Sequence, residues 1–406
     1  MENDKNTIFL AIDENTIFLA IVVSLVIYGL IIFVIILYTI RKERIKTALN
    51  KSKSESLLSS ENNNTVHTFK NKTVKHFDYI IIKKYKIFEN FKLEKLNRIN
   101  IFAGFNNSGK TTLLEAIYLL IQQNNMGALF DIIKVKNKLN ELTTLYLTNN
   151  IINNIEILGQ FNGVKVTIDL EKFEAIDINK NDYLASYKIN SSIDDDFLDN
   201  TIHIFNENSL ERRYERIEIL CNSIFKSPYF YNQDEIVETY SKSLKSGEID
   251  EIITFIQKHI DSNIIGISHD GINTFIVKHK IPINSPELTS YGEGLQRIFE
   301  IALSFAYCKN GVLLIDEFET AIHYSLLVDF TKFIQELAIK FNVQVFITSH
   351  SKECIDAFVN NGVHNEDISA YLLDNISNNI EAIYIDGEEL KEYIDSTDFD
   401  LRGQYD

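Results

Sequence analysis

The longest hydrophobic run in the chain lies near its start. Residues 17–40 read IFLAIVVSLVIYGLIIFVIILYTI and contain no charged side chain. A helix needs about 20 apolar residues to cross the hydrocarbon core of a bilayer. The run therefore predicts one transmembrane helix over 17–40, preceded by a short extracytoplasmic segment, 1–16. A buried helix and a cleaved signal peptide are the alternatives.

The segment 41–75 that follows is polar and basic. Nine Lys and Arg residues stand against three Glu, without apolar periodicity. Basic residues beside a span stay in the cytoplasm, so we expect a single-pass protein of the cell (inner) membrane with most of the chain cytoplasmic. Residues 41–75 are then a linker, either simply solvated or held against anionic lipid.

From residue 76 onward, the pattern is that of one α/β domain, 76–406. Short apolar runs predict strands at 79–82, 86–88, 98–103, 312–315 and 343–348. Apolar residues at helical spacing follow at 112–122 and again from Ile298. Between these parts we expect an α/β insert at about 124–285, with strands at 154–158 and 165–170 and helices at 209–225 and 235–259.

A glycine loop joins the strand 98–103 to the helix 112–122. It reads Gly104-Phe105-Asn106-Asn107-Ser108-Gly109-Lys110-Thr111-Thr112 and fits GxxxxGK(S/T). Gly104 and Gly109 let backbone N–H groups face phosphate oxygens, and the helix start adds partial positive charge. Lys110 can reach the β- and γ-phosphates of ATP, and the hydroxyl of Thr111 can bind Mg²⁺. The alternative, a glycine turn that binds nothing, does not account for the flanking strand and helix.

Two acidic residues and a histidine follow the next predicted strands. Asp316 and Glu317 come directly after 312–315, and His350 comes shortly after 343–348. An Asp at such a strand end helps to hold Mg²⁺ in P-loop enzymes, and Glu317 is placed to act as general base on the attacking water. His350 can hydrogen-bond the γ-phosphate or that water. A solvated strand end and an ordinary loop histidine are the alternatives.

A second anion-binding arrangement lies upstream, at the start of the helix that contains Ile298. Ser290, Gly292 and Gly294 occur within SYGEG at this point. One nucleotide does not need two such sites from one chain. Two copies arranged head to tail would use both, each closing over the partner's ATP. A plain capped helix start is the alternative.

In this order, the motifs resemble those of ABC-superfamily ATPases, in particular small bacterial AAA-family ATP-binding proteins related to the overcoming-lysogenization-defect (OLD) nucleases. The resemblance covers about 76–406. It rests on FAGFNNSGKTTLLEAI, SYGEGLQRIFEIAL, GVLLIDEFETAIHYSL and QVFITSHSKECIDAF, and the Asp-Leu-Arg at 400–402 looks like that group's usual ending.

The resemblance implies a mixed β-sheet P-loop fold and a homodimer that sandwiches ATP. It makes Lys110 and Thr111 phosphate-loop ligands, Asp316 the Mg²⁺ acid, Glu317 the base and His350 the switch histidine. Asn106, Asn107, Ser108 and Thr112 complete the cofactor-binding loop, while Ser290, Gly292 and Gly294 act on the partner's nucleotide. Residues 319–323 correspond to the dimer-facing D-loop, although Thr320-Ala321 replaces the usual Asn-Gly.

Some features of the chain depart from that group or limit which functions the resemblance can imply. The 56 residues after His350 are too few for the metal-dependent nuclease domain of the OLD proteins, so we expect any nuclease to be a separate chain. No glutamine stands out as the Q-loop residue among Gln122, Gln123 and Gln160. The insert also lacks the apolar heptads of a long coiled coil, which disfavours chromosome-structuring ATPases.

Composition and net charge limit which classes of protein and which partners remain to be considered. The chain of 406 residues is 45% hydrophobic and 24% charged, which excludes disorder over its whole length. Its net charge is −17, whereas a general nucleic-acid binder shows a basic face. The net charge therefore does not support nucleic acid as a partner, although it does not exclude a local binding groove. We expect the partner to be a separate effector protein.

The leading hypothesis is a membrane-anchored, ATP-hydrolysing dimer switch that acts with a partner, in phage defence or a nucleic-acid-linked process. The alternatives are the ATP-binding subunit of an ABC transporter and a non-catalytic ATP-binding scaffold. One span cannot line a transport path, and Glu317 argues against a scaffold. The acidic cluster Asp194-Asp195-Asp196 leaves a nuclease in the insert as a further alternative to a solvated loop.

Overall fold

The computed structural model describes residues 67–68 and 76–402, with short gaps. The gaps are 138–141, 153, 176–181, 207–208, 229–232, 271–273, 282–285, 377–378 and 398–399. The predicted span 17–40 and nearly all of the linker lie outside the described residues. Within the described part of the chain, no helix combines the length and the apolar character that crossing a bilayer requires.

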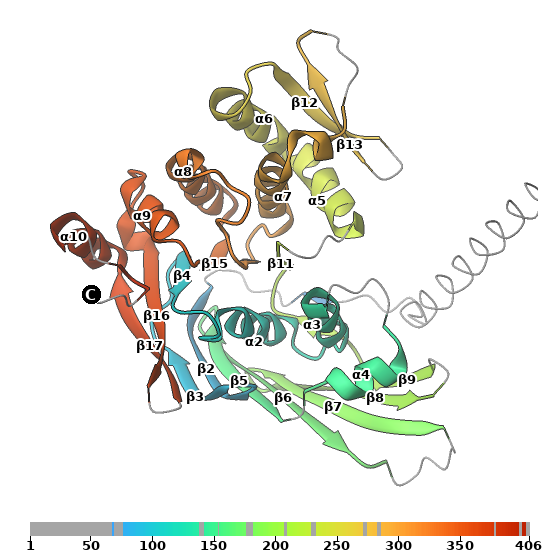
Figure 1. Cartoon of the computed structure of the whole chain (residues 1–406). Helices are drawn as coiled ribbons and strands as arrows, with labels where there is room; N and C mark the ends of the chain where they lie inside the picture. Colours follow the sequence, from blue (N-terminus) through green and yellow to red (C-terminus); the bar gives the residue numbers. More distant parts are fainter. Residues whose placement is uncertain are drawn as a thin grey trace, which may run out of the picture. The chain divides into compact units, whose positions relative to one another are not determined.

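A six-stranded, mostly parallel sheet carries the glycine loop (Figure 1). The strands lie in the order β11 (Ser223–Lys226), β14 (Val312–Ile315), β15 (Gln344–Thr348), β4 (Ile99–Ala103), β16 (Ile368–Ile376) and β17 (Asn379–Asp386). Neighbouring strands run parallel except β17, which is antiparallel to β16. Every residue of β4, β14 and β15 is buried, because both faces of the sheet are covered.

The second sheet has seven antiparallel strands. They lie in the order β3 (Phe88–Leu93), β2 (Phe77–Tyr85), β5 (Ile155–Phe161), β6 (Val164–Phe173), β7 (Tyr183–Ile193), β8 (Asp196–Phe205) and β9 (Ser209–Tyr214). Buried and more exposed residues alternate along β5. This period of two is expected when one face of a sheet packs on a core and the other meets solvent.

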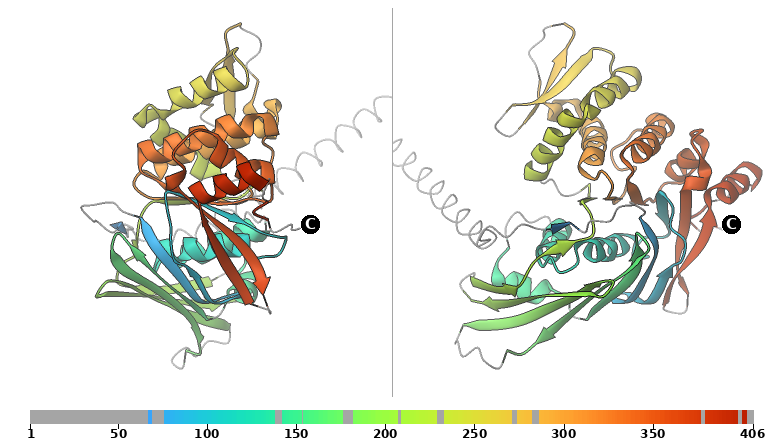
Figure 2. Two further views of the ribbon diagram at one scale, coloured as in Figure 1. Left: turned by 90° about the vertical axis from the view of Figure 1, so that its left-hand side faces the viewer. Right: turned by 180° about the vertical axis from the view of Figure 1, so that it is seen from behind.

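Helix α2 (Lys110–Gln122) lies between the two sheets (Figures 1 and 2). Its apolar residues share one core with the inner face of the antiparallel sheet and with Phe102, Leu314 and Phe346 of the parallel sheet. Helices α3 (Gly127–Asn137) and α4 (Thr144–Asn150) extend this layer, and α4 packs on β7 and β8. The helix that follows the glycine loop is thus anchored on both sides.

The other face of the parallel sheet is covered by a second helical layer. Ile101, Ile315 and Ile347 point into the core that these helices share. The helices are α5 (Gln233–Ser246), α6 (Glu248–His259), α7 (Glu293–Tyr307), α8 (Tyr324–Phe341), α9 (Lys352–Asn360) and α10 (Gly387–Thr397). Alternate residues of each buried strand therefore serve two different cores, one on each side of the sheet.

Short elements complete the described structure. They are the hairpin β12 (Ile264–His269) and β13 (Phe275–His279), the parallel pair β1 (His67–Thr68) and β10 (Glu218–Ile219), and the 3₁₀ turns η1 (Leu288–Tyr291) and η2 (Asn365–Asp367). Hairpin β12–β13 packs near α6 and η1.

The expected helix at 209–225 is wrong. The structure has strands β9, β10 and β11 there, because β9 pairs with β8 and β11 pairs with β14. The expected helix at 235–259 is instead two helices, α5 and α6, separated by Gly247 in a left-handed conformation with φ of 76°. The stretch expected as an insert, 124–285, supplies five strands to the antiparallel sheet and one to the parallel sheet.

Candidate functional site

The glycine loop follows β4 at the carboxyl edge of the parallel sheet. Gly104 has φ of +143°, and a Cβ atom built there would lie 2.5 Å from the carbonyl oxygen of Leu373. Gly109 has φ of +92°, and its Cβ atom would lie 2.7 Å from Cδ1 of Ile87. Both positions therefore disfavour larger residues by conformation, and Gly104 also by space, because the atom it meets belongs to the backbone. The close packing holds the loop backbone in its curled form.

Lys110 begins α2 and folds back over the loop. Its Nζ atom donates hydrogen bonds to the carbonyl oxygens of Gly104 and Phe105, both at 2.8 Å. Burial lowers the pKa of Lys110 to about 8, while Asp316, Glu319 and Glu317 oppose that shift. The ammonium group is thus held inside the loop by neutral carbonyl oxygens, with three carboxylates near enough to influence its charge.

Thr111 and Asp316 lie within hydrogen-bond distance across the site. Thr111 Oγ1 donates to Asp316 Oδ2 at 2.9 Å, joining the start of α2 to the end of β14. Arg297 of α7 donates from Nη2 to the backbone carbonyl of Asp316 at 2.8 Å. The carboxylate of Asp316 is buried, and burial raises its pKa. An acid and a hydroxyl of the kind that hold Mg²⁺ are therefore in place.

Glu317 adopts a positive φ of 46°, which is uncommon for a residue with a side chain. Its backbone N–H donates to Thr348 Oγ1 at 2.8 Å. Its Oε2 atom accepts a hydrogen bond from Thr320 Oγ1 at 3.2 Å. Two neighbouring elements, β15 and the loop 319–323, therefore determine where this carboxylate lies.

His350 lies in the turn between β15 and α9. Its backbone N–H donates to Glu319 Oε1 at 2.6 Å. Burial lowers the pKa of the imidazole, Lys110 lowers it further, and Glu319, Glu317 and Asp316 oppose the shift. The histidine is therefore electrostatically coupled to the same residues that surround Lys110.

The second predicted loop lies at the start of α7. Ser290 and Gly292 are exposed, and Gly292 has φ of +89° with open space where a Cβ atom would lie. Gly294 is close to the loop that follows Glu317, because its Cβ atom would lie 2.6 Å from the carbonyl oxygen of Ala321. The exposed position leaves Ser290 and Gly292 open to a partner molecule.

The remaining sequence candidates divide into two groups. Ser108 is buried and Thr112 is half-buried in the loop region, whereas Asn106 and Asn107 are exposed on it. Gln122 and Gln123 lie at the far end of α2, and Gln160 lies in β5 of the other sheet. None of these three glutamines is at the carboxyl edge of the parallel sheet.

The acidic cluster of the insert lies in a hairpin. Asp194 and Asp195 form the turn between β7 and β8, and Asp196 forms an ion pair with Arg216. Among the described residues, no group of three or more His, Cys, Asp or Glu side chains is arranged to hold a metal ion.

Sequence reasoning missed three side chains that support the site. Thr348 contacts both acidic residues, Arg297 holds the Asp316 backbone, and Arg402 reaches the backbone of His350. All three lie in segments that support the resemblance, including Asp-Leu-Arg at 400–402, and the change from strand to polar loop after Ile347 is a usable signal for Thr348. No spacing in the sequence connects Arg402 to His350.

Comparison with known families agrees with this arrangement. Residues 99–356 match the family described as "AAA domain, putative AbiEii toxin, Type IV TA system". The match runs from β4 into α9 and covers more than half of the chain. The chain belongs to this family. It is thus an AAA-domain protein with an α/β P-loop fold, and the narrower OLD-related assignment stays a prediction.

Two relatives match different lengths of this AAA-domain protein. It is 25% identical over 316 residues to an "ATP/GTP phosphatase" of Helicobacter pylori, covering 68% of this chain and 85% of that protein. It is 34% identical over 118 residues to an uncharacterized protein of Methanocaldococcus jannaschii, covering 28% of this chain and 99% of that protein.

Solved structures similar to this AAA-domain protein include SMC head domains. The head domain from Thermotoga maritima has a TM-score of 0.37 and 9% identity, covering 77% of this chain and all of that one. An SMC head bound to the C-winged helix domain of ScpA has a TM-score of 0.41 and 12% identity, covering 78% and 100%. The fold class of this chain follows from its family match and from the strand order of the parallel sheet.

Proposed function

We propose that the chain is an ATPase that works as a nucleotide-driven dimer switch. The observation that carries this proposal is the hydrogen-bonded chain from Thr111 through Asp316 and Thr348 to Glu317, which lies beside the glycine loop. Side chains from α2, β14 and β15 thereby converge at one edge of the parallel sheet. The name of the Helicobacter pylori relative, ATP/GTP phosphatase, supports the same reaction class.

The residues present fit a nucleotide triphosphate. Glycine at positions 104 and 109 allows the positive φ angles of the loop, a curled backbone of the kind whose N–H groups bind phosphate oxygens. The Lys110 ammonium group donates to two carbonyl oxygens of the loop. When a nucleotide binds, phosphate oxygens would take the place of these carbonyl oxygens as acceptors. Thr111 and Asp316 would hold Mg²⁺, which supplies neutralising charge for the β- and γ-phosphates when bound.

The other residues have separate tasks in the proposed reaction. Glu317 takes the proton of the attacking water as general base. Its backbone is held by Thr348, so its carboxylate is kept at the end of β14. His350 donates or accepts a hydrogen bond at the γ-phosphate side of the site, and Lys110 offsets the developing charge.

The proposed dimer uses the exposed start of α7. Ser290, Gly292 and Gly294 of one copy would cover the nucleotide of the other, in a head-to-tail ATP sandwich. Exposure of Ser290 and Gly292 supports this arrangement, since a partner copy can reach them. ATP then closes the dimer and hydrolysis reopens it.

We further propose a place of action and a kind of partner. Residues 17–40 would anchor the chain in the cell (inner) membrane, with the ATPase domain in the cytoplasm. A separate effector protein would respond to the dimer, in defence against phage or in a nucleic-acid-linked process. The words "putative AbiEii toxin, Type IV TA system" in the family description are compatible with a defence role.

The test compares the purified full chain with Glu317→Gln. We expect ATP turnover in the wild type, its loss in the variant, and an ATP-dependent dimer trapped by the variant, with oligomeric state followed by light scattering. Glu336→Gln is the matched control, because it removes one carboxylate from the exposed face of α8. Stimulation by added DNA would favour a nucleic-acid sensor.

Some outcomes would refute the proposal. Nucleotide binding without turnover in the wild type, and without an ATP-dependent dimer, would indicate a scaffold. Cell fractionation tests the anchor separately: full chain in the soluble fraction, with a deletion of 17–40 behaving identically, would refute membrane attachment.

A further inference from the structure

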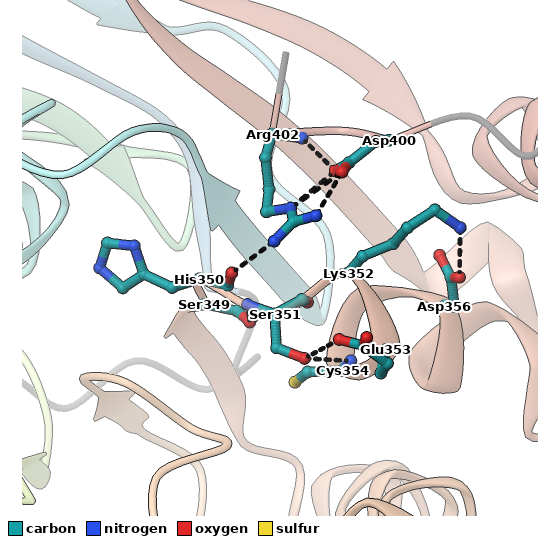
Figure 3. Close-up of polar contacts among 9 residues, drawn as sticks. All are labelled: Ser349, His350, Ser351, Lys352, Glu353, Cys354, Asp356, Asp400 and Arg402. Atoms are coloured by element: carbon teal, nitrogen blue, oxygen red, sulfur yellow. Dashed lines mark hydrogen bonds and ion pairs between the residues drawn. The ribbon is translucent and has the colours of Figure 1, made fainter. Parts of the chain in front are cut away.

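The last described residues lie beside the loop that carries His350. Figure 3 shows the segment 400–402 alongside the turn 349–351, which leads from β15 into α9. Arg402 Nη1 donates a hydrogen bond to the backbone carbonyl oxygen of His350 at 3.2 Å. The two residues are separated by 51 others in the sequence, so this contact is made by the fold.

The peptide groups of His350 are held on both sides. The backbone N–H donates to Glu319 Oε1 at 2.6 Å, while the carbonyl oxygen accepts from Arg402. Glu319 belongs to the loop that follows the two acidic residues of β14. With both the N–H and the carbonyl oxygen engaged, the backbone at His350 has little freedom to rotate.

Arg402 is itself held in place. Its Nε atom donates to Asp400 Oδ1 at 2.8 Å, and its backbone N–H donates to the same oxygen at 2.9 Å. Asp400 also pairs with Nη2 of the guanidinium. Leu401 lies between Asp400 and Arg402 in the sequence. Its side chain is 2% exposed and belongs to the core under the second helical layer. The buried Leu401 anchors the segment, and Asp400 orients the arginine.

The histidine ring points away from this contact. In Figure 3 the imidazole extends to the side opposite the Arg402 guanidinium, while the carbonyl oxygen faces it. The turn is further ordered by Ser351, which caps α9 by accepting the N–H of Cys354 at 3.1 Å. Arg402 therefore contacts His350 through the backbone carbonyl oxygen, on the side away from the ring.

We propose that Arg402 is a positioning residue for His350, which it holds in the orientation required for ATP hydrolysis. This inference rests on the proposed ATPase function. Asp400 and Leu401 serve the same role indirectly, because they hold the guanidinium against the carbonyl oxygen. A segment remote in the sequence would thus set the efficiency of hydrolysis without contributing to nucleotide binding.

The test measures turnover and nucleotide binding separately on the purified full chain. We expect Arg402→Ala to lower kcat about tenfold or more, with the dissociation constant of a non-hydrolysable ATP analogue unchanged within about twofold. Arg402→Lys should retain part of the wild-type kcat. Recovery should be incomplete, because one ammonium group cannot bind both Asp400 and the carbonyl oxygen as the guanidinium does. Millimolar guanidinium ion should also restore part of the kcat of Arg402→Ala.

A matched control separates positioning from general stability. Lys391→Ala removes an exposed contact of α10, where Nζ donates to Asn360 Oδ1 at 2.9 Å, and should leave kcat at the wild-type value. Wild-type kcat in Arg402→Ala would overturn the proposal. Parallel losses of kcat, analogue affinity and thermal stability, without rescue by guanidinium, would show a merely structural role. A wild type that binds the analogue but never hydrolyses ATP would refute the proposed function first, and the positioning role with it.

Discussion

Thr348 donates a hydrogen bond of 2.6 Å to Asp316 Oδ1, the carboxylate at the end of the neighbouring strand. The same hydroxyl oxygen accepts the backbone N–H of Glu317 at 2.8 Å. Burial raises the pKa of Asp316, and the hydrogen bonds from Thr348 and Thr111 oppose that shift. One hydroxyl from β15 thus orients both acidic residues that follow β14 and favours the charged form of Asp316.

Thr348→Val should lower ATP turnover about tenfold or more and cost roughly 1–3 kcal/mol of stability, because it removes one of the two hydroxyl donors of the buried Asp316 carboxylate and the acceptor of the Glu317 N–H. Steady-state kinetics and urea unfolding measure the two effects. Thr348→Ser should restore most of the turnover. The control is Thr254→Val, which removes an exposed hydroxyl bonded to the Asp250 carbonyl oxygen on α6. Equal turnover in Thr348→Val and Thr254→Val would contradict the role assigned to Thr348.

Gly294→Ala should weaken the ATP-dependent dimer while sparing nucleotide binding by the monomer. The added Cβ atom would lie 2.6 Å from the Ala321 carbonyl oxygen, so the loop 319–323 must move. Light scattering with ATP and Mg²⁺, on a Glu317→Gln background, follows the dimer. Gly266→Ala is the control, since its Cβ atom would make ordinary contacts of 3.8 Å with Lys278. A dimer of undiminished affinity would rule out this packing as part of the interface.

Nucleotide binding should take up a proton at alkaline pH. Burial lowers the pKa of Lys110 to about 8, so the free protein loses this charge as the pH rises through that value. Phosphate oxygens favour the charged form, hence the bound state keeps the proton. Affinity should therefore fall above about pH 8 and level off below it. Calorimetry in two buffers of different ionisation enthalpy counts the protons, and Lys110→Arg should abolish the uptake, whatever its effect on affinity.

Glu248→Gln should stabilise the protein increasingly as the pH rises. Glu248 is fully buried, its Oε1 atom has no hydrogen-bond partner, and burial raises its pKa from 4.5 to about 8. The folded state thus holds a proton that the unfolded chain releases, so wild-type stability falls from about pH 4.5 to about pH 8. Glutamine mimics the protonated acid and keeps an acceptor for Ser243 and the Ala306 N–H.

The gain from Glu248→Gln should reach roughly 1–3 kcal/mol near pH 8 and be small near pH 5. Urea unfolding at a series of pH values measures it. Glu251→Gln on the exposed side of the same helix should show no such pH dependence. A stability difference independent of pH would mean that Glu248 is already charged in the folded protein.

The parts of the site that lie in continuous motifs could be predicted from the sequence. The strand 312–315 has the bounds of β14, because an uninterrupted apolar run ends at Asp316. The glycine loop lies between β4 and α2, where its glycines and Lys110 required it to be. Local signals sufficed here, since strand, turn and helix are adjacent in the chain.

The sequence-based predictions that were wrong concern residues whose structure depends on contacts with distant parts of the chain. Leu210, Tyr214 and Ile217 are spaced as in a helix, yet Leu210 pairs with Ile204 on β8, and the sheet overrides the local pattern. Gly247 breaks the expected helix 235–259, because its left-handed conformation ends α5 and starts α6. The contact of Arg402 with His350 depends on how the whole second helical layer packs, which no short window of sequence contains.

Helix α2 has almost no free surface, since ten of its 13 residues are buried between two sheets. The helix behind the phosphate loop is therefore packed on both sides, against the parallel and the antiparallel sheet. In the proposed switch, a movement that follows hydrolysis would pass through Asp316, Glu317 and His350 to the helices on the opposite side of the parallel sheet. Under that proposal, α2 and the antiparallel sheet would form the stationary part of the domain, and the layer of α7, α8 and α9 would be the part that moves against a partner.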